Sequence, residues 1–136
     1  GHTIGRIKSR GNDELGRWTY VKLFGRSDKV ITLISAYQVC NNALTGTTAY
    51  HQQHSALIQR GDKLPNPRRQ FQHDLRKFLR QCQANSESII LVGDCNENLD
   101  INTPGTAKLC EEHERVDIFA ARHPNNEEFS TYIRGT

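Results

Sequence analysis

The alternation of apolar and polar residues along the chain predicts a small β-sheet. Residues 17–24, RWTYVKLF, alternate with period two and are rich in aromatic and β-branched side chains, as is typical of a strand. Residues 29–37, KVITLISAY, and residues 89–93, IILVG, are apolar on both faces. We therefore expect both to be buried and the first to be central in its sheet. A shorter strand is predicted at Ile4–Ile7, followed by the polar loop SRGNDELG.

Helical patterns separate the second and third of these strands. Residues 45–61 fit a helix with a threonine cap and a terminal glycine. The next helix begins with Asn66 as its N-cap and Pro67 in its first position. Its apolar residues recur at helical spacing and form one stripe: Phe71, Leu75, Phe78, Leu79 and Cys82. Another helical segment is predicted over residues 106–122, and a last strand begins in residues 129–136.

This strand–helix–strand order predicts an α/β fold. A helical crossover between two apolar strands joins parallel neighbours and packs on one face of the sheet. Ligands of such sheets gather at the carboxyl ends of the strands. Tyr37 ends one strand, and Asp94 and Asn96 follow the other, so we expect the three at one sheet edge. The alternative interpretation is that Asp94 and Asn96 only cap the turn after the strand.

The three side chains suit phosphodiester hydrolysis. A carboxylate such as Asp94 can position and deprotonate a water molecule. The Asn96 amide and the Tyr37 phenol can donate hydrogen bonds to phosphate oxygens. The spacing of Asp94 and Asn96 fits a shared site, because alternate residues of an extended segment point the same way.

Composition describes one globular domain with an uneven charge distribution. The chain has 136 residues, of which 24% are charged, and its net charge is +3. Residues 1–30 carry seven Lys or Arg against three acids, residues 58–80 carry seven against two, and residues 87–128 carry ten acids against three bases. The basic segments favour an anionic partner and the acidic one suits a divalent cation, although solvated surfaces give the same pattern.

Several classes are excluded or disfavoured. No apolar run is long enough to span a membrane, and no signal peptide is visible. No phosphate-binding G-x-x-x-x-G-K-[ST] loop accompanies the IILVGD strand, which excludes a P-loop hydrolase. Four cysteines without paired spacing favour free thiols in a reducing compartment, the cytoplasm or nucleus, and leave a disulfide pair open.

The G-D-x-N at residues 93–96, with Tyr37 in ISAYQVCNN and the STYI strand, resembles the endonuclease/exonuclease/phosphatase superfamily. The likeness covers nearly all of residues 1–136 and is strongest to the retroelement-type and abasic-site endonucleases. It implies a DNase I-like α/β-sandwich, with a mixed sheet and helices packed on its outer face. The family also includes lipid and inositol phosphatases that share the G-D-x-N, so a phosphoinositide or lipid substrate remains an alternative to DNA.

The resemblance implies roles for individual residues. Asp94 would orient or activate the nucleophile, and Asn96 and Tyr37 would bind phosphate, with Mg²⁺ or Mn²⁺ as cofactor. Substrate contacts would come from Asn41, Asn42 and Thr131, although Gln-Val-Cys follows Tyr37 where the family commonly has x-Pro, which shifts the register by one residue. DNA is the favoured partner, together with the remainder of a parent chain that can include a reverse transcriptase.

The resemblance also leaves parts of the family pattern unmatched. The family's early metal-binding Glu and its closing Asp and S-D-H His have no counterpart in the sequence, which contains no Met. We expect a partial domain cut from a longer protein, with little nuclease activity of its own. A non-catalytic nucleic-acid-binding or interaction module that keeps the fold is the second hypothesis. Glu97, Asn98 and Asp100 either assist a metal or form a solvated acidic loop, and the arginines that include Arg68 and Arg69 are expected on a solvated helix face.

Overall fold

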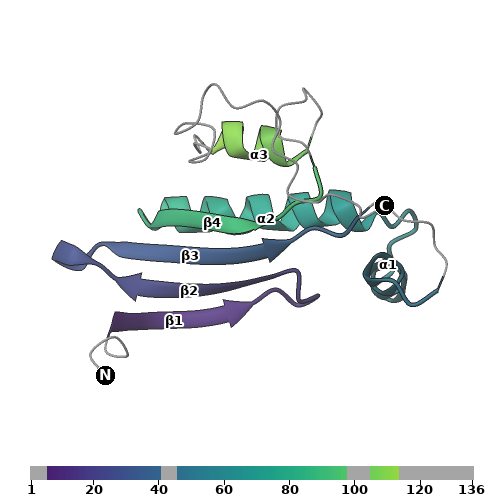
Figure 1. The fold of residues 1–136 in the computed structure, drawn as a ribbon, viewed down its shortest axis with the longest axis horizontal. Helices are drawn as coiled ribbons and strands as arrows, with labels where there is room; N and C mark the ends of the chain where they lie inside the picture. Colours follow the sequence, from purple (N-terminus) through teal and green to yellow (C-terminus); the bar gives the residue numbers. More distant parts are fainter. Residues whose placement is uncertain (1–5, 41–45, 98–104, 114–136) are drawn as a thin grey trace, which may run out of the picture.

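The structure, a computed structural model, describes residues 6–40, 46–97 and 105–113. Its centre is a four-stranded sheet with the strand order β1-β2-β3-β4 (Figure 1). The strands are β1 (Ile7–Asn12), β2 (Trp18–Phe24), β3 (Val30–Tyr37) and β4 (Ser88–Asp94). The first three pair antiparallel and β4 pairs parallel to β3. This mixed sheet with its helices confirms the predicted α/β class.

The crossover between β3 and β4 is the part of the topology that the apolar pattern predicted. β3 lies between β2 and β4, as expected for a strand that is apolar on both faces. Parallel strands cannot be joined by a tight turn, and the two helices between β3 and β4 supply the long connection. The short 3₁₀ turn η2 (Arg26–Asp28) connects β2 to β3 in the predicted GRSD turn.

The prediction that a polar loop follows Ile7 was wrong, and Ile4 of the predicted first strand lies outside the described residues. The segment that reads as a polar loop forms β1, whose Arg10 pairs with Val21 and whose Gly11 pairs with Tyr20. β1 is a polar strand at the edge of the sheet, and its Lys8 and Arg10 are exposed. Charged side chains are common on edge strands because they discourage pairing with other chains. An edge strand therefore lacks the apolar alternation that identifies a buried one.

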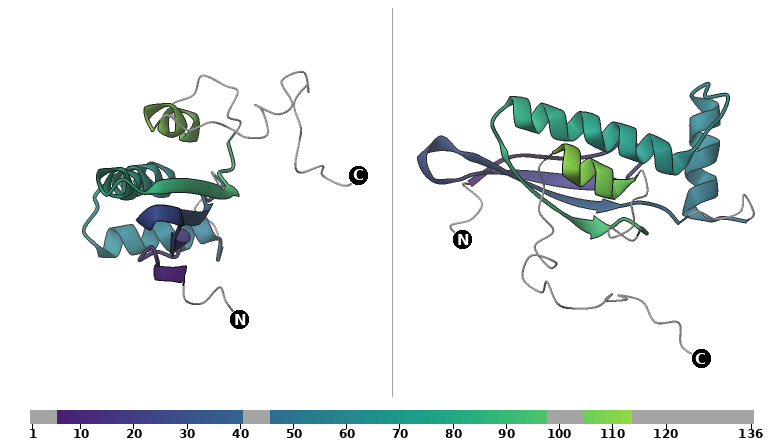
Figure 2. Two further views of the ribbon diagram at one scale, coloured as in Figure 1. Left: turned by 90° about the vertical axis from the view of Figure 1, so that its left-hand side faces the viewer. Right: turned by 90° about the horizontal axis from the view of Figure 1, so that it is seen from above.

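Helix α2 (Pro67–Ala84) covers one face of the sheet and forms the core with it (Figure 2). The Asn66 side chain accepts a hydrogen bond from the Arg69 backbone N–H at 3.0 Å and caps the helix, as predicted. The core consists of the helix stripe, two strands and one residue of α3: Trp18, Ile34, Ala36, Phe71, Leu75, Leu79 and Leu109. Each fully buried Leu or Phe contributes about 1.5–3 kcal/mol through the hydrophobic effect.

Two shorter helices flank this core. Helix α1 (Ala49–Gln59) begins at Thr48, whose side chain accepts a hydrogen bond from the His51 backbone N–H. Helix α3 (Thr106–Glu112) packs beside α2 and places Leu109 in the core (Figure 1). Among the described helices, none combines the length and the apolar character that a membrane crossing requires.

The other face of the sheet carries apolar side chains that the described residues leave partly exposed. Inward and outward positions alternate along β3, and Leu33 and Tyr37 point away from α2. In β4, Ile90 and Val92 point to the same outer face and are 44% and 50% exposed. The prediction that β4 is too apolar to be half-exposed is therefore wrong for the part of the chain described here.

None of the four cysteines forms a disulfide. Cys82 is buried at the end of the sheet where β4 begins, beside the ion pair between Lys22 Nζ and Glu87 Oε1 at 2.7 Å. Burial and the hydrogen bond with Glu87 raise the pKa of the Cys82 thiol to about 11. The thiol therefore stays protonated at neutral pH and is a poor nucleophile or metal ligand.

Gly93 allows β4 to approach β3 closely, and its replacement by alanine should destabilise the fold. A Cβ at this position would lie 1.9 Å from the Ala36 carbonyl oxygen and 2.8 Å from its carbonyl carbon. Neither backbone can yield without disturbing the β3–β4 ladder, so we expect a loss of about 2–3 kcal/mol in the free energy of unfolding. Urea unfolding followed by circular dichroism measures this loss.

Gly16→Ala is the matched control for this change. Gly16 has a φ of +68° but no atom within 4 Å of a built Cβ, so the substitution introduces backbone strain without a collision. We expect it to cost about 1 kcal/mol. If Gly16→Ala destabilises the protein as much as Gly93→Ala does, the close approach of β4 to β3 is not the reason for glycine at position 93.

Candidate functional site

Tyr37 and Asp94 lie next to each other at the carboxyl ends of two parallel strands. Tyr37 on β3 is the register partner of Asp94 on β4. The preceding pair, Ala36 and Gly93, lies on the face toward α2, so Tyr37 and Asp94 occupy the opposite face. Tyr37 is 44% exposed and Asp94 is also exposed. A ligand at this edge can therefore reach the phenol and the carboxylate together.

The end of β3 is anchored by a buried guanidinium. The Tyr37 backbone N–H donates to the Arg17 carbonyl oxygen at 2.8 Å. The Arg17 side chain forms ion pairs with Asp13 and with Asp74 on α2, each at 2.6 Å. Arg17 is 3% exposed, and such a charge is stable in the interior only because it is paired and hydrogen-bonded. The network fixes β2, β3 and α2 relative to one another at the Tyr37 end of the sheet.

Asn96 joins the segments that follow the two strands. Its backbone N–H donates to Asp94 Oδ1 at 2.9 Å, and its side-chain Nδ2 donates to the Gln38 carbonyl oxygen at 2.7 Å. Its Oδ1 accepts from the Cys40 thiol at 3.0 Å. The backbone at Asn96 has a φ of +46°, a conformation that asparagine tolerates better than most residues. A side-chain amide has two N–H donors, so one remains for a ligand.

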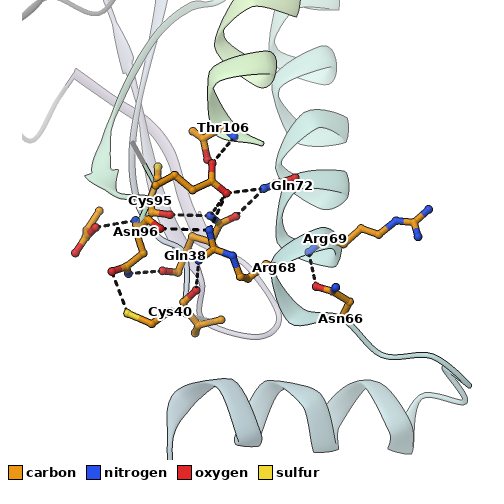
Figure 3. A network of polar contacts seen from close by, with 12 residues as sticks. Gln38, Cys40, Asn66, Arg68, Arg69, Gln72, Cys95, Asn96 and Thr106 are labelled. Carbon is orange, nitrogen blue, oxygen red and sulfur yellow. Dashed lines mark hydrogen bonds and ion pairs between the residues drawn. The ribbon is translucent and has the colours of Figure 1, made fainter. Parts of the chain in front are cut away.

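Glu97 is the centre of a polar network between the strand ends and the helices. Figure 3 shows its partners Gln38, Arg68, Gln72 and Thr106 gathered at this edge. Its Oε1 accepts hydrogen bonds from Gln38 Nε2 at 2.8 Å, Arg68 Nη2 at 2.7 Å and Gln72 Nε2 at 3.0 Å. Its Oε2 accepts from the Thr106 backbone N–H at 2.6 Å, at the start of α3. One carboxylate therefore connects the ends of β3 and β4 to both α2 and α3.

The ionised form of Glu97 is stabilised by these donors. Burial alone would raise its pKa, but the hydrogen bonds from Thr106 and Gln38 and the charge of Arg68 outweigh burial and lower the pKa below its usual value. Arg68 also donates to the carbonyl oxygens of Val39 at 2.7 Å and Asn96 at 3.3 Å. The guanidinium thus holds the loops that carry Asn96.

The structure corrects two sequence interpretations here. Arg68 does not lie on a solvated helix face, because its guanidinium points inward to Glu97 and to the strand ends. Glu97 does not belong to a solvated acidic loop, since both of its oxygens accept hydrogen bonds within the protein. The reason in each case is tertiary packing, which brings residues 29 positions apart into contact.

The remaining predicted site residues fall outside the described part of the chain. Asn41 and Asn42 belong to the range 41–45, Asn98 and Asp100 to 98–104, and Thr131 to 114–136. Of the predicted catalytic residues, the structure brings Tyr37 and Asp94 into register and places Asn96 beside them.

Sequence reasoning missed Gln38, Gln72 and Thr106 as members of this edge. Gln38 is fully buried although its side chain is polar. It donates to the Cys95 carbonyl oxygen as well as to Glu97. The alternation of β3 provides one signal for it: a polar residue directly after Tyr37 falls on the inward face. No comparable signal identifies Thr106, which contributes its backbone N–H.

One exposed carboxylate at this edge, Asp94, has the chemistry of a divalent-cation ligand. No group of three His, Cys, Asp or Glu side chains among the described residues is arranged to hold a metal ion. Mg²⁺ commonly uses one or two carboxylates together with waters and substrate phosphates. Asp94 fits this pattern as one exposed ligand, and further ligands would have to come from the substrate or from other segments.

Comparison with known proteins gives no further guide to this edge. The chain matches no protein-family model, no curated protein and no solved structure.

Proposed function

We propose that the chain is part of a metal-dependent phosphodiester hydrolase with a DNase I-like fold, and that its substrate is DNA. The observation that carries the proposal is the register of Tyr37 with Asp94 on the open face of two parallel strands, with Asn96 adjoining them. This juxtaposition is what the G-D-x-N resemblance requires. Retroelement-type and abasic-site endonucleases are the branches that the sequence resembles.

Each of the three residues has a role in this proposal. The Asp94 carboxylate orients an attacking water molecule and accepts its proton. The second N–H of the Asn96 amide and the Tyr37 hydroxyl donate to non-bridging oxygens of the phosphate, where negative charge accumulates in the transition state. A bound Mg²⁺ or Mn²⁺ would add charge neutralisation at the same phosphate, with Asp94 among its ligands.

The polar network around Glu97 supports this arrangement by fixing the loops. Asn96 can bind a phosphate oxygen only if its amide stays in place, and it is held by bonds to Gln38, Cys40 and Asp94. Arg68 and Glu97 then hold the Asn96 segment against α2. Preorganised donors of this kind stabilise a transition state without having to reorganise during the reaction.

One observation favours a second function, a nucleic-acid-binding module without catalysis. Asp94 Oδ1 already accepts the Asn96 N–H in a side-chain-capped turn, which is the arrangement expected if the two residues only shape the loop. In that case a phosphate would be bound at this edge but not cleaved. The two functions differ in whether the phenol and the carboxylate affect a cleavage rate.

Replacing Tyr37 by phenylalanine tests the hydrolase proposal. Plasmid nicking with Mg²⁺ is measured for a protein that contains this sequence together with the flanking Glu and Asp/His segments that the resemblance implies. We expect Tyr37→Phe to slow nicking by about 10- to 100-fold, because one donor to the phosphate is lost.

The same assay with EDTA should show no nicking by either protein. Tyr20→Phe is the control, because Tyr20 lies on the α2 face of β2 against Phe78, away from Asp94. Unchanged nicking by Tyr37→Phe, or nicking that persists in EDTA, would contradict the proposal and leave the binding module as the better interpretation.

A further inference from the structure

The outer surface of α2 carries a line of basic side chains. Arg69, His73, Lys77 and Arg80 are exposed and recur at intervals of three or four residues, so they lie along one side of the helix. Arg76 lies beside them. We call Arg69, His73, Arg76, Lys77 and Arg80 the α2 basic stripe.

The stripe borders two shallow hollows that meet at His73. The first, of about 390 Å³, is lined by Arg69 and His73 together with Asp62, Leu64, Asn66 and Gln70. The second, of about 360 Å³, is lined by His73, Arg76, Lys77, Arg80, Gln81 and Ala84. The concave surface therefore follows α2 from its first turn to its last turn.

Most of the positive charge on this surface is not neutralised by the described residues. Among the residues that the structure describes, Arg69, Lys77 and Arg80 form no ion pair. Asp74 is the acidic residue of α2, and it is directed to Arg17 rather than to the stripe. Carboxylates also adjoin the surface: Glu112 pairs with Arg76 at 2.6 Å, and Asp62 lines the first hollow.

We propose that the α2 basic stripe binds the sugar–phosphate backbone of a nucleic-acid strand. Arg69 and Arg80 are eleven residues apart, which corresponds to about 16 Å along a helix. Along one strand of a duplex this distance covers about five phosphates. The stripe contains no Phe, Tyr or Trp side chain on which bases could stack, and four of its five residues are Arg or Lys, so its main contacts are to phosphate and its binding is independent of sequence.

The position of the stripe connects it to the candidate site. Arg69 follows Arg68, whose guanidinium donates to the carbonyl oxygens of Val39 and Asn96 at the ends of the strands. The stripe therefore begins beside the edge that carries Asp94 and extends away from it along α2. It adds a binding surface beyond the proposed hydrolytic edge, and it does not require that this edge cleaves anything.

The test measures binding of a fluorescent DNA duplex of mixed sequence to the 136-residue chain by anisotropy, with EDTA present so that metal-dependent cleavage cannot contribute. The variant Arg69→Gln/Lys77→Gln/Arg80→Gln removes three exposed cations while keeping good helix-forming residues. We expect it to bind about 10- to 100-fold more weakly at low salt. The slope of log binding constant against log salt concentration should become shallower by about two to three.

The matched control is Lys8→Gln/Arg10→Gln/Arg26→Gln. It changes the net charge from +3 to 0 as the stripe variant does, but the cations are exposed on β1 and η2, and β1 is at the other edge of the sheet from β4. We expect its affinity and salt slope to stay near the wild-type values. Circular dichroism verifies that both variants are folded.

Three outcomes would overturn the proposal: no binding by the wild-type chain, equal losses in the two triple variants, or a strong dependence on DNA sequence. A single-stranded oligonucleotide, tested in parallel, shows whether the stripe prefers a duplex. Because Asp94 is intact and EDTA is present throughout, these results do not depend on the outcome of the nicking assays.

Discussion

Replacing Asp94 by alanine is expected to lower Mg²⁺-dependent DNA nicking by about 10²–10⁴-fold, the range in which positioned proton-transfer groups contribute. The reason is that Asp94 is an exposed carboxylate in register with Tyr37, whereas the nearby Glu97 carboxylate is occupied by internal hydrogen bonds. The measurement is the initial rate of plasmid nicking by a protein that carries this sequence with its flanking segments. The 136-residue chain by itself is expected to nick DNA weakly or not at all.

Asp94→Asn separates the two roles that Asp94 can have. The amide oxygen of an asparagine still accepts the Asn96 backbone N–H, so the turn and the thermal unfolding midpoint should be retained. The amide cannot accept a proton from water, so nicking should fall as it does in Asp94→Ala. Asp28→Asn makes the same change at an exposed carboxylate in η2. Asp28 precedes the first residue of β3, at the opposite end of the strand from Tyr37, so this variant should leave nicking unchanged.

An Asp94→Asn variant that nicks DNA at the wild-type rate would show that the carboxylate is not used in chemistry. Asp94 would then be a turn-capping residue, and the edge would at most bind phosphate. The same result would remove the main reason to consider Asp94 a ligand of Mg²⁺. If Asp94→Ala lost both its nicking activity and its folded structure, the result would not reveal the role of the carboxylate. Asp94→Asn keeps the turn and is therefore the deciding variant.

The central topology was predictable because burial leaves a strong mark on a sequence. β3 is apolar on both faces and α2 has a complete apolar stripe with an Asn-Pro start, and both form where the pattern predicted them. The crossover predicted that β3 and β4 pair in parallel, and this pairing places Tyr37 opposite Asp94. These features depend on local periodicity and on a general rule of chain connection.

The elements that were mispredicted depend on contacts that periodicity does not encode. β1 is polar because it is an edge strand, so its sequence, IKSRGN, resembles a loop. Arg68 is in the first turn of α2, where the helical pattern places it beside the apolar stripe rather than within it. Whether such a side chain points to solvent or reaches Glu97 depends on where β4 ends, and that becomes known only when the strands are assembled.

Replacing Glu97 by glutamine should destabilise the fold by about 2–4 kcal/mol at neutral pH, because removing one charge of a partly buried pair leaves the other uncompensated. The Glu97 and Arg68 side chains are 19% and 18% exposed. A glutamine would also put an N–H group among donors from Gln38, Gln72 and Arg68 that now converge on an acceptor. The free energy of unfolding from urea denaturation is the measurement.

The difference between wild type and Glu97→Gln should depend on pH in one direction. The folded pKa of Glu97 is lowered from its usual value of 4.5, so its contribution to stability is complete above that pH and is lost as the pH falls through the lower, folded value. The other carboxylates with lowered pKa values, such as Asp13 and Glu87, are present in both proteins and cancel in the difference. The two unfolding free energies should therefore converge in acid.

Glu112→Gln is the control for the loss of a negative charge. It separates that effect from the effects of burial and of several donors that converge on one carboxylate. Glu112 also accepts from an arginine, with 2.6 Å between Arg76 Nε and its Oε2, but this pair lies on the surface and is screened by water. Its loss should change the unfolding free energy little at any pH. If Glu97→Gln were equally mild, the polar network would not hold the Asn96 segment in place. The alignment of Asn96 with Asp94 would then have to come from the Gln38 and Cys40 contacts alone.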